Sequence, residues 1–161
     1  MALPCYMTLQ NASGQAVEGS CAIQGHEGAV LVQAVEHLIE LPKNPQTGLV
    51  SGKREHLGLK VTKEIDKSSP TLMNTLCSGA QLKSVTLTFD RINKQGKQEL
   101  YYTIALTNVN VVLSRLWVAN CLERENSSLG HMEDISFTYE AITWTWAQGN
   151  LEAQDSWTQP K

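Results

Sequence analysis

The sequence has no long apolar run, since stretches such as Ala29–Val32 end after a few residues. A helix that crosses a bilayer needs about 20 predominantly apolar residues, so a membrane-spanning helix is excluded. A secretory signal is also missing, because Met1–Met7 has neither a basic segment nor a long apolar one. If the protein leaves its cell, we expect it to do so without a cleaved signal peptide.

Close cysteine pairs are absent too. The four cysteines are widely spaced and form no CxxC motif: Cys5, Cys21, Cys77 and Cys121. Without an export signal, this spacing predicts reduced and mostly buried thiols rather than disulfides. It also lacks the ligand spacing of a tetrahedral zinc site, so we predict no metal.

A basic excess is missing as well. Thirteen Lys and Arg against 16 Asp and Glu give a net charge of −3, which argues against a nucleic-acid binder. The charge is uneven, with +1 over residues 1–100 and −4 over residues 101–161. Five cations lie close together in the sequence, either as a solvated face or as a patch that meets an acidic patch on another copy: Lys53, Arg54, Lys60, Lys63 and Lys67.

What is present fits one globular domain, residues 1–161, with 42% hydrophobic residues and no internal repeat. Alternating or β-branched patterns predict strands at residues 5–10, 19–24, 29–41, 82–92, 99–113 and 135–146, and a short one ending at Trp157. Turn formers predict an extended loop at about 42–56, and a second loop at 114–130. The extended loop has the composition to pair weakly with itself as a hairpin.

Two local features refine this pattern. The turn Asn93–Gly96 joins two of the strands into a β-hairpin. In 135–146 the apolar residues change parity midway, which predicts a bulge near Glu140 and Ala141.

A single helix is predicted at about 69–78. Ser69 can serve as its N-cap, Pro70 suits the first turn, and Gly79 ends it. Apolar residues recur on one face, which indicates core packing: Leu72, Met73, Leu76 and Cys77. The fold class is therefore mainly β, a small antiparallel β-barrel or sandwich with one short helix.

No recognisable active site accompanies this fold. The histidines His26, His37, His56 and His131 form no metal motif, and no serine lies in a G-x-S-x-G elbow. Glu133 and Asp134 are neighbours on a predicted strand, so they face opposite sides and make a poor acid–base pair. We expect no catalysis and no cofactor.

The segment Thr62–Pro70, followed by Leu72 and Cys77-Ser-Gly79, resembles the hemolysin-coregulated proteins, the tube subunits of type VI secretion systems. The likeness extends along nearly the whole chain but leaves out 114–128. Its other motifs follow in the family's order: Ala2-Leu-Pro4 with Tyr6, Gln24 with Glu27-Gly28, Thr47-Gly48, Gly52, Arg54 with His56, Asn108-Val109, Val111-Val112, His131-Met-Glu133, Tyr139-Glu140, Ile142-Thr-Trp144, Gly149-Asn150 and Asp155-Ser-Trp157.

The resemblance implies a tight β-barrel with a flanking helix and a protruding loop, assembled into a hexameric ring. In the family, rings stack into a hollow tube, which a contractile sheath expels from a bacterium with a spike at its tip. Effector cargo can travel in the lumen. It implies a protein that is cytoplasmic before firing and extracellular afterwards.

We predict that Lys53, Arg54 and His56 contact a neighbouring copy or ring, with a solvated surface as the alternative for each. Glu64 and Asp66 either pair with such cations or favour the N-terminal end of the helix. The competing hypothesis for the whole chain is a monomeric β-barrel that binds a small ligand in an apolar interior cavity.

Overall fold

The computed structural model describes residues 2–159 and is mainly β, as the sequence predicts. It contains the helix α1 (Ser69–Ser78), a 3-10 turn at Arg124–Asn126 and eight strands: β1 (Cys5–Gln10), β2 (Ala16–Val17), β3 (Val30–Glu40), β4 (Glu55–Glu64), β5 (Gln81–Ile92), β6 (Gln98–Val118), β7 (His131–Trp146) and β8 (Leu151–Ser156).

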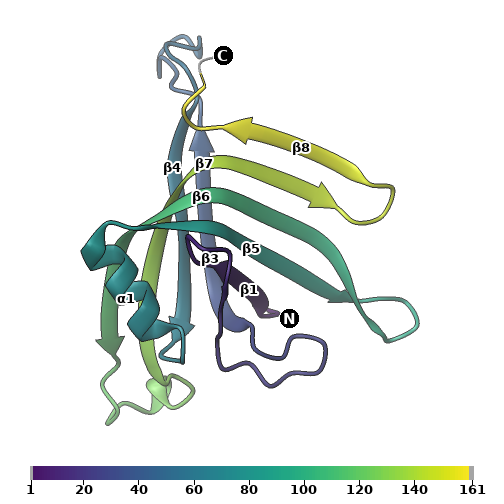
Figure 1. The fold of residues 1–161 in the computed structure, drawn as a ribbon. Coiled ribbons are helices and arrows are strands. Elements are labelled where there is room, and N and C mark those ends of the chain that lie inside the picture. Colours follow the sequence, from purple (N-terminus) through teal and green to yellow (C-terminus); the bar gives the residue numbers. More distant parts are fainter. Residues whose placement is uncertain (1, 160–161) are drawn as a thin grey trace.

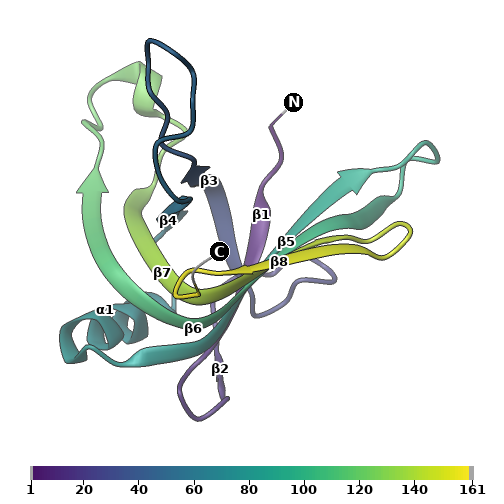
Figure 2. The same cartoon turned by 90° about the horizontal axis from the view of Figure 1, so that it is seen from above.

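The strands form one antiparallel sheet that closes on itself. Their order is β2-β1-β3-β4-β7-β6-β5, and β1 also pairs with β5, which completes a barrel. Figure 1 shows α1 on the outside of this barrel, where it packs against β6. Figure 2 shows the curved wall formed by β6 and β7.

One edge of β7 carries two different partners in succession. Residues 132–137 pair with β4, whereas residues 141–146 pair with β8. Beyond the barrel, β8 and the hairpin-side ends of β5, β6 and β7 (residues 89–92, 98–102 and 143–146) extend together to one side (Figure 1), and we call them the arm. The C-terminal strand therefore lies at the free edge of the arm.

The predicted change of parity in 135–146 is confirmed, but the predicted bulge near Glu140 and Ala141 is wrong. The β6–β7 register stays constant through those residues, and its shift lies on β6 between Val111 and Leu113. The buried face changes where Asn108 on β6, which has a φ of 51°, lies opposite Glu140. On β5, β6 and β7 the buried positions change between even and odd residue numbers at this same level. The buried residues on the two sides of the change are Leu82 and Val85 on β5, Leu106 and Val109 on β6, and Tyr139 and Ile142 on β7.

The barrel interior is filled with side chains, as in other small closed barrels. The fully buried members of the core come from six strands and from the inner face of α1: Met7, Val30, Val32, Leu59, Val61, Leu72, Val85, Leu87, Leu106, Val109, Phe137 and Ile142. This core occupies the space that a ligand-carrying barrel would leave as a cavity. The alternation predicted for 82–92 is confirmed there, since Val85 and Leu87 point inward.

The helix lies where the sequence places it, with two corrections. The N-cap is Ser68, so Ser69 is already helical, and Pro70 occupies the first turn. Gly79 ends the helix in the left-handed conformation, at a φ of 70°. Only part of the predicted apolar stripe is core, because Leu72 is buried whereas Met73 and Cys77 are exposed.

Three strand predictions are wrong. Residues 19–24 are a loop, because Gly25 and Gly28 adopt positive φ and the loop closes on itself through bonds such as Cys21 N–H to the Ala29 carbonyl, 3.0 Å. The sequence pattern predicts no strand at β4, because Gly58 interrupts it. Strand β6 continues to Val118, so the predicted loop 114–130 is limited to 119–130. After the register shift between Val111 and Leu113, the outward-facing residues of β6 are apolar as well, so the sequence does not alternate there.

The cysteines are free, as predicted, but they are not mostly buried. Cys5 lies in the core, where burial raises the pKa of its thiol to about 12. Cys21 is half-buried, and Cys77 and Cys121 are exposed.

Candidate assembly interface

The extended loop is a folded-back segment between β3 and β4. A bridge pairs Lys43 with Val50, and the Ser51 N–H donates to the Pro42 carbonyl at 2.9 Å, which confirms the predicted weak hairpin. The loop ends at Arg54 rather than at residue 56, because Glu55 and His56 belong to β4. Its tip exposes Leu49 and Val50, and Lys53 is exposed near its end.

Arg54 lies at the root of this loop and binds the C-terminal segment of its own chain. Its Nε donates to the Asp155 carboxylate, and its Nη2 donates to the carbonyls of Ser156 and Gln159, both at 2.8 Å. The side chain is only 16% exposed. Arg54 therefore fastens the end of β8 to the start of β4.

His56 is buried beside Arg54, so the alternative of a solvated surface is wrong for this residue. Its Nε2 lies 2.9 Å from Asp155 Oδ2, and its Nδ1 lies 2.7 Å from the Tyr139 hydroxyl. The same hydroxyl lies 2.8 Å from Nε2 of His37 on β3. We call this group the junction: His37, Arg54, His56, Tyr139 and Asp155.

The junction is covered by an aromatic ring. Trp157 stacks on His56 with 5.4 Å between ring centroids and also contacts the Tyr139 ring. Burial, followed by the Asp155 charge, raises the pKa of Tyr139 above its ordinary range. Burial, followed by the neighbouring His56, lowers the pKa of His37. The phenol is therefore a neutral hydrogen-bonding group that links the two histidines.

Glu64 and Asp66 lie at the other end of β4, away from the junction. Glu64 is exposed and accepts from Gln33 Nε2 at 3.1 Å. Asp66 accepts from Lys63 Nζ at 2.9 Å and from the Ser68 N–H at 3.0 Å, just before α1. Within the chain, Arg54 and His56 bind Asp155 and not Glu64 or Asp66. Asp66 instead organises the start of the helix.

Lys63 is not part of a solvated face, since its side chain has no exposed surface. It forms ion pairs with Asp66 and Glu133, and it donates to Ser69 Oγ at 3.1 Å. The predicted opposite orientation of Glu133 and Asp134 is confirmed, because Asp134 bonds outward to Thr62 and Arg115. The Lys63 cluster is thus a buried connection between β4, β7 and α1.

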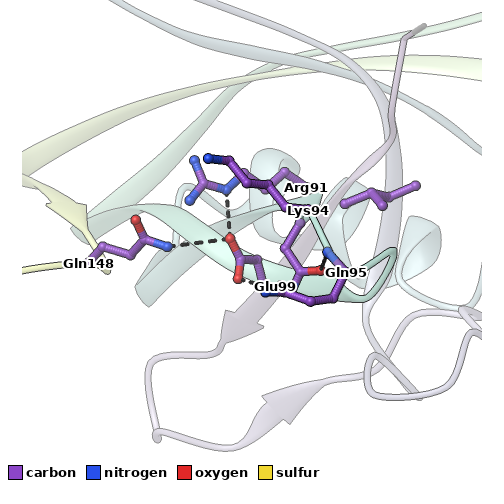
Figure 3. A pocket seen from close by; sticks show the side chains of 7 residues that line it. Arg91, Lys94, Gln95, Glu99 and Gln148 are labelled. Carbon is purple, nitrogen blue, oxygen red and sulfur yellow. Dashed lines mark hydrogen bonds and ion pairs between the residues drawn. The ribbon is translucent and has the colours of Figure 1, made fainter.

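A surface hollow of about 430 Å³ lies at the tips of the arm's two hairpins, and Figure 3 shows its lining. Arg91 donates to Glu99 Oε1 at 2.8 Å, and Gln148 Nε2 donates to the same oxygen at 3.4 Å. The guanidinium lies over the rings of Tyr101 and Trp146, 5.3 and 5.5 Å from their centroids. These contacts tie the two hairpin tips together.

Sequence reasoning placed Arg54 and His56 together but missed their partners. Asp155 lies 101 residues after Arg54, and Tyr139 lies 83 residues after His56; only the motifs Asp155-Ser-Trp157 and Tyr139-Glu140 mark them. In the part of the chain that the structure describes, no group of three or more His, Cys, Asp or Glu residues could hold a metal ion. No helix among residues 2–159 is long and apolar enough to cross a membrane.

Comparison with known proteins identifies the family. The family model described as "Type VI secretion system effector, Hcp" matches residues 6–146. The "Major exported protein" of Pseudomonas aeruginosa PAO1 is 35% identical, over 99% of this chain and 98% of that protein.

Solved structures agree with this assignment. The Hcp1 protein from the E. coli EAEC 042 pathovar superposes with a TM-score of 0.87 at 34% identity, over 97% of this chain and 99% of that one. The secreted protein Hcp3 of P. aeruginosa gives a TM-score of 0.79 at 28% identity, over 97% and 99%. The chain therefore belongs to the Hcp family of type VI secretion proteins.

Proposed function

We propose that this protein is a structural subunit of the type VI secretion inner tube, in which six copies form a ring and rings stack into a hollow tube. The observation that carries the proposal is the match of nearly the whole chain to the solved Hcp1 structure. A match over 97% of the chain leaves little of it for an unrelated activity. The role is mechanical rather than catalytic.

The exposed apolar residues support assembly. They come from the extended loop, from the outer faces of β3, β4 and β6, and from the edge strand β8: Leu49, Val50, Leu38, Leu57, Leu116, Val118 and Leu151. Contacts between copies would remove these side chains from water. The free edge of β8 also offers unpaired backbone groups that a neighbouring copy can cover.

The candidate residues divide between two roles in this proposal. Lys53 and Glu64, both exposed and of opposite charge, are the ones available to a neighbouring copy or ring. Arg54, His56 and Asp66 act from within the subunit by holding the loop root and the start of α1 in place. Contact across copies then depends on the loop that Arg54 positions.

The remaining partners follow from the same role. The tube is expelled by the sheath with a spike at its tip, and small effectors ride in its lumen. The subunit is made in the bacterial cytoplasm and reaches the outside only when the apparatus fires. The name of the P. aeruginosa relative, "Major exported protein", agrees with that destination.

The experiment is the native mass in solution, measured by light scattering behind size exclusion over a wide range of concentrations. The proposal predicts a species of six times the 17.8 kDa chain, which dissociates on dilution by mass action. A monomer at every concentration would contradict it and would leave a single-chain binding role to be tested.

A further inference from the structure

The junction is a hydrogen-bonded group of titratable side chains that joins four strands and the root of the extended loop. His37 comes from β3, Arg54 from the end of the extended loop, His56 from the start of β4, Tyr139 from β7 and Asp155 from β8. Its hydrogen bonds limit where the protons of the two histidines and of Tyr139 can lie.

The proton positions follow from Asp155. Because its carboxylate only accepts hydrogen bonds, the proton of neutral His56 must lie on Nε2. Nδ1 of His56 is then an acceptor, so the Tyr139 hydroxyl donates to it. The oxygen of Tyr139 in turn accepts from Nε2–H of His37. With both histidines neutral, each donor in this series of hydrogen bonds has one acceptor.

One added proton is tolerated. On His37 it occupies Nδ1, which leaves the Nε2–H bond to Tyr139 in place. On His56 it must occupy Nδ1, and Tyr139 can then donate to Nε2 of His37 if His37 is neutral with its proton on Nδ1. In both cases every hydrogen bond between Asp155, His56, Tyr139 and His37 is kept.

Two added protons are not tolerated. Tyr139 would then face an N–H from each histidine, and its own O–H would have no acceptor among the junction's groups. The second positive charge would also lie near the Arg54 guanidinium. Within the junction, Asp155 is the one carboxylate that bonds to Arg54 and to His56, so it would have to balance the added charge. The other carboxylates nearby, Glu40 and Glu55, are an exposed cross-strand pair at the end of β3 and β4.

Besides the junction, β8 is held by its ladder with β7, by the Trp157 N–H and the Ser156 hydroxyl, which both donate to the Glu140 carbonyl, and by the Trp157 ring, which packs on His56 and Tyr139. Residues 151–154 of β8 are exposed, and β8 pairs with β7 alone. The barrel does not depend on it, because β4 pairs with a different part of β7. Opening of the junction would therefore release β8 and the segment through Gln159 from the loop root without unfolding the barrel.

We propose that the junction is a proton-sensitive latch: it fastens the C-terminal strand to the root of the extended loop while no more than one of His37 and His56 is protonated, and it opens when both are. The lowered pKa of His37 agrees with this, because its burial and the neighbouring His56 oppose protonation until the pH is acidic. The inference concerns the single chain and does not rest on ring formation.

Hydrogen exchange with mass spectrometry on the full chain tests the latch. Protection of residues 151–159 is compared with that of 82–92 between about pH 7.5 and pH 4.5, the range that brackets histidine titration, after correction for the intrinsic exchange rate. Protection of 151–159 should fall about tenfold or more on acidification while that of 82–92 holds. Light scattering on the same samples separates this opening from any change of assembly.

Two variants and a control sharpen the result. His37→Gln keeps a donor to Tyr139 but removes one of the two protonation sites, so 151–159 should stay protected at acidic pH. Tyr139→Phe removes the hydroxyl that links the two histidines, so protection of 151–159 should be low at every pH. His131→Gln, at an exposed histidine, should behave as the wild type. The latch is overturned if 151–159 shows no pH dependence, if it opens only together with 82–92, or if His37→Gln opens as the wild type does.

Discussion

Lys63 and Glu133 form an ion pair across β4 and β7 in which the lysine side chain has no exposed surface and the carboxylate side chain is 5% exposed. Burial of an ion pair is costly, and the cost is offset here because Asp66, Ser69 and the Glu64 carbonyl also accept hydrogen bonds from the ammonium. The pair also fixes where α1 begins relative to the barrel.

Removal of the cation should therefore be strongly destabilising. Lys63→Ala leaves the buried Glu133 carboxylate and the partly buried Asp66 carboxylate without their cation, and we expect a loss of about 3–5 kcal/mol in the free energy of unfolding. Lys53→Ala, at an exposed lysine, should change it by less than about 0.5 kcal/mol. Urea denaturation measures both, and equal effects would show that the Lys63 cluster contributes nothing special.

Lys53 and Arg54 are adjacent but should fail differently when each is replaced by glutamate. Lys53→Glu should leave stability unchanged and reduce ring stacking several-fold, because a ring face repeats a small electrostatic change at each copy. Arg54→Glu should reduce stacking and also expose β8 to exchange, since a second carboxylate would face Asp155. Electron microscopy of stacked particles and exchange of 151–159 separate the two outcomes. Intact stacking in both variants would remove the loop root from the interface.

Gly58 should not tolerate a side chain. Its φ is +84°, and a Cβ there would lie 2.8 Å from the Phe137 carbonyl oxygen. Gly48 has a φ of +72° but nothing within 4 Å, so Gly48→Ala isolates the conformational cost of about 1–2 kcal/mol. Gly58→Ala should cost clearly more, because β4 must also move away from β7. A thermal melt of each variant decides, and equal losses would contradict the steric argument.

The stability of the fold should decrease below about pH 6.5 through His37. Because its pKa is lowered in the folded chain, the unfolded chain binds more protons as the pH falls through the ordinary value of 6.5. The free energy of unfolding should therefore be flat above that pH and decline below it, and His37→Gln should reduce the decline. Urea titrations near pH 7.5 and pH 5.5 provide the comparison; an unchanged slope in the variant would locate the pH dependence elsewhere.

Sequence periodicity was sufficient for the helix and for the strands with clean alternation. In 82–92, Val85 and Leu87 share a face because one side of the strand packs on the core. It failed where the backbone rather than the side chains decides: Gly25 and Gly28 turn residues 19–28 into a loop, and Gly58 interrupts the pattern of β4. Past the bulge in β6, exposed Leu116 and Val118 hide the alternation because that surface is apolar.

The site was predictable only in part for a similar reason. Arg54 and His56 attract attention as polar residues close together in the sequence, but such residues carry no sign of whether their partner is solvent, another copy or their own chain. Asp155 is distant in sequence and reaches His56 only because β8 and β4 share one edge of β7. Lys63 lies between Lys60 and Lys67 in the sequence, and nothing there marks it as the buried one that pairs with Asp66 and Glu133.

The central claim, that this chain builds a hollow ring, is tested most directly by electron microscopy of the purified full-length protein, with two-dimensional averages of the particles seen end-on. The account predicts rings of six copies around an open channel, some of them stacked. Compact particles the size of one chain, with no ring at any concentration, would contradict it.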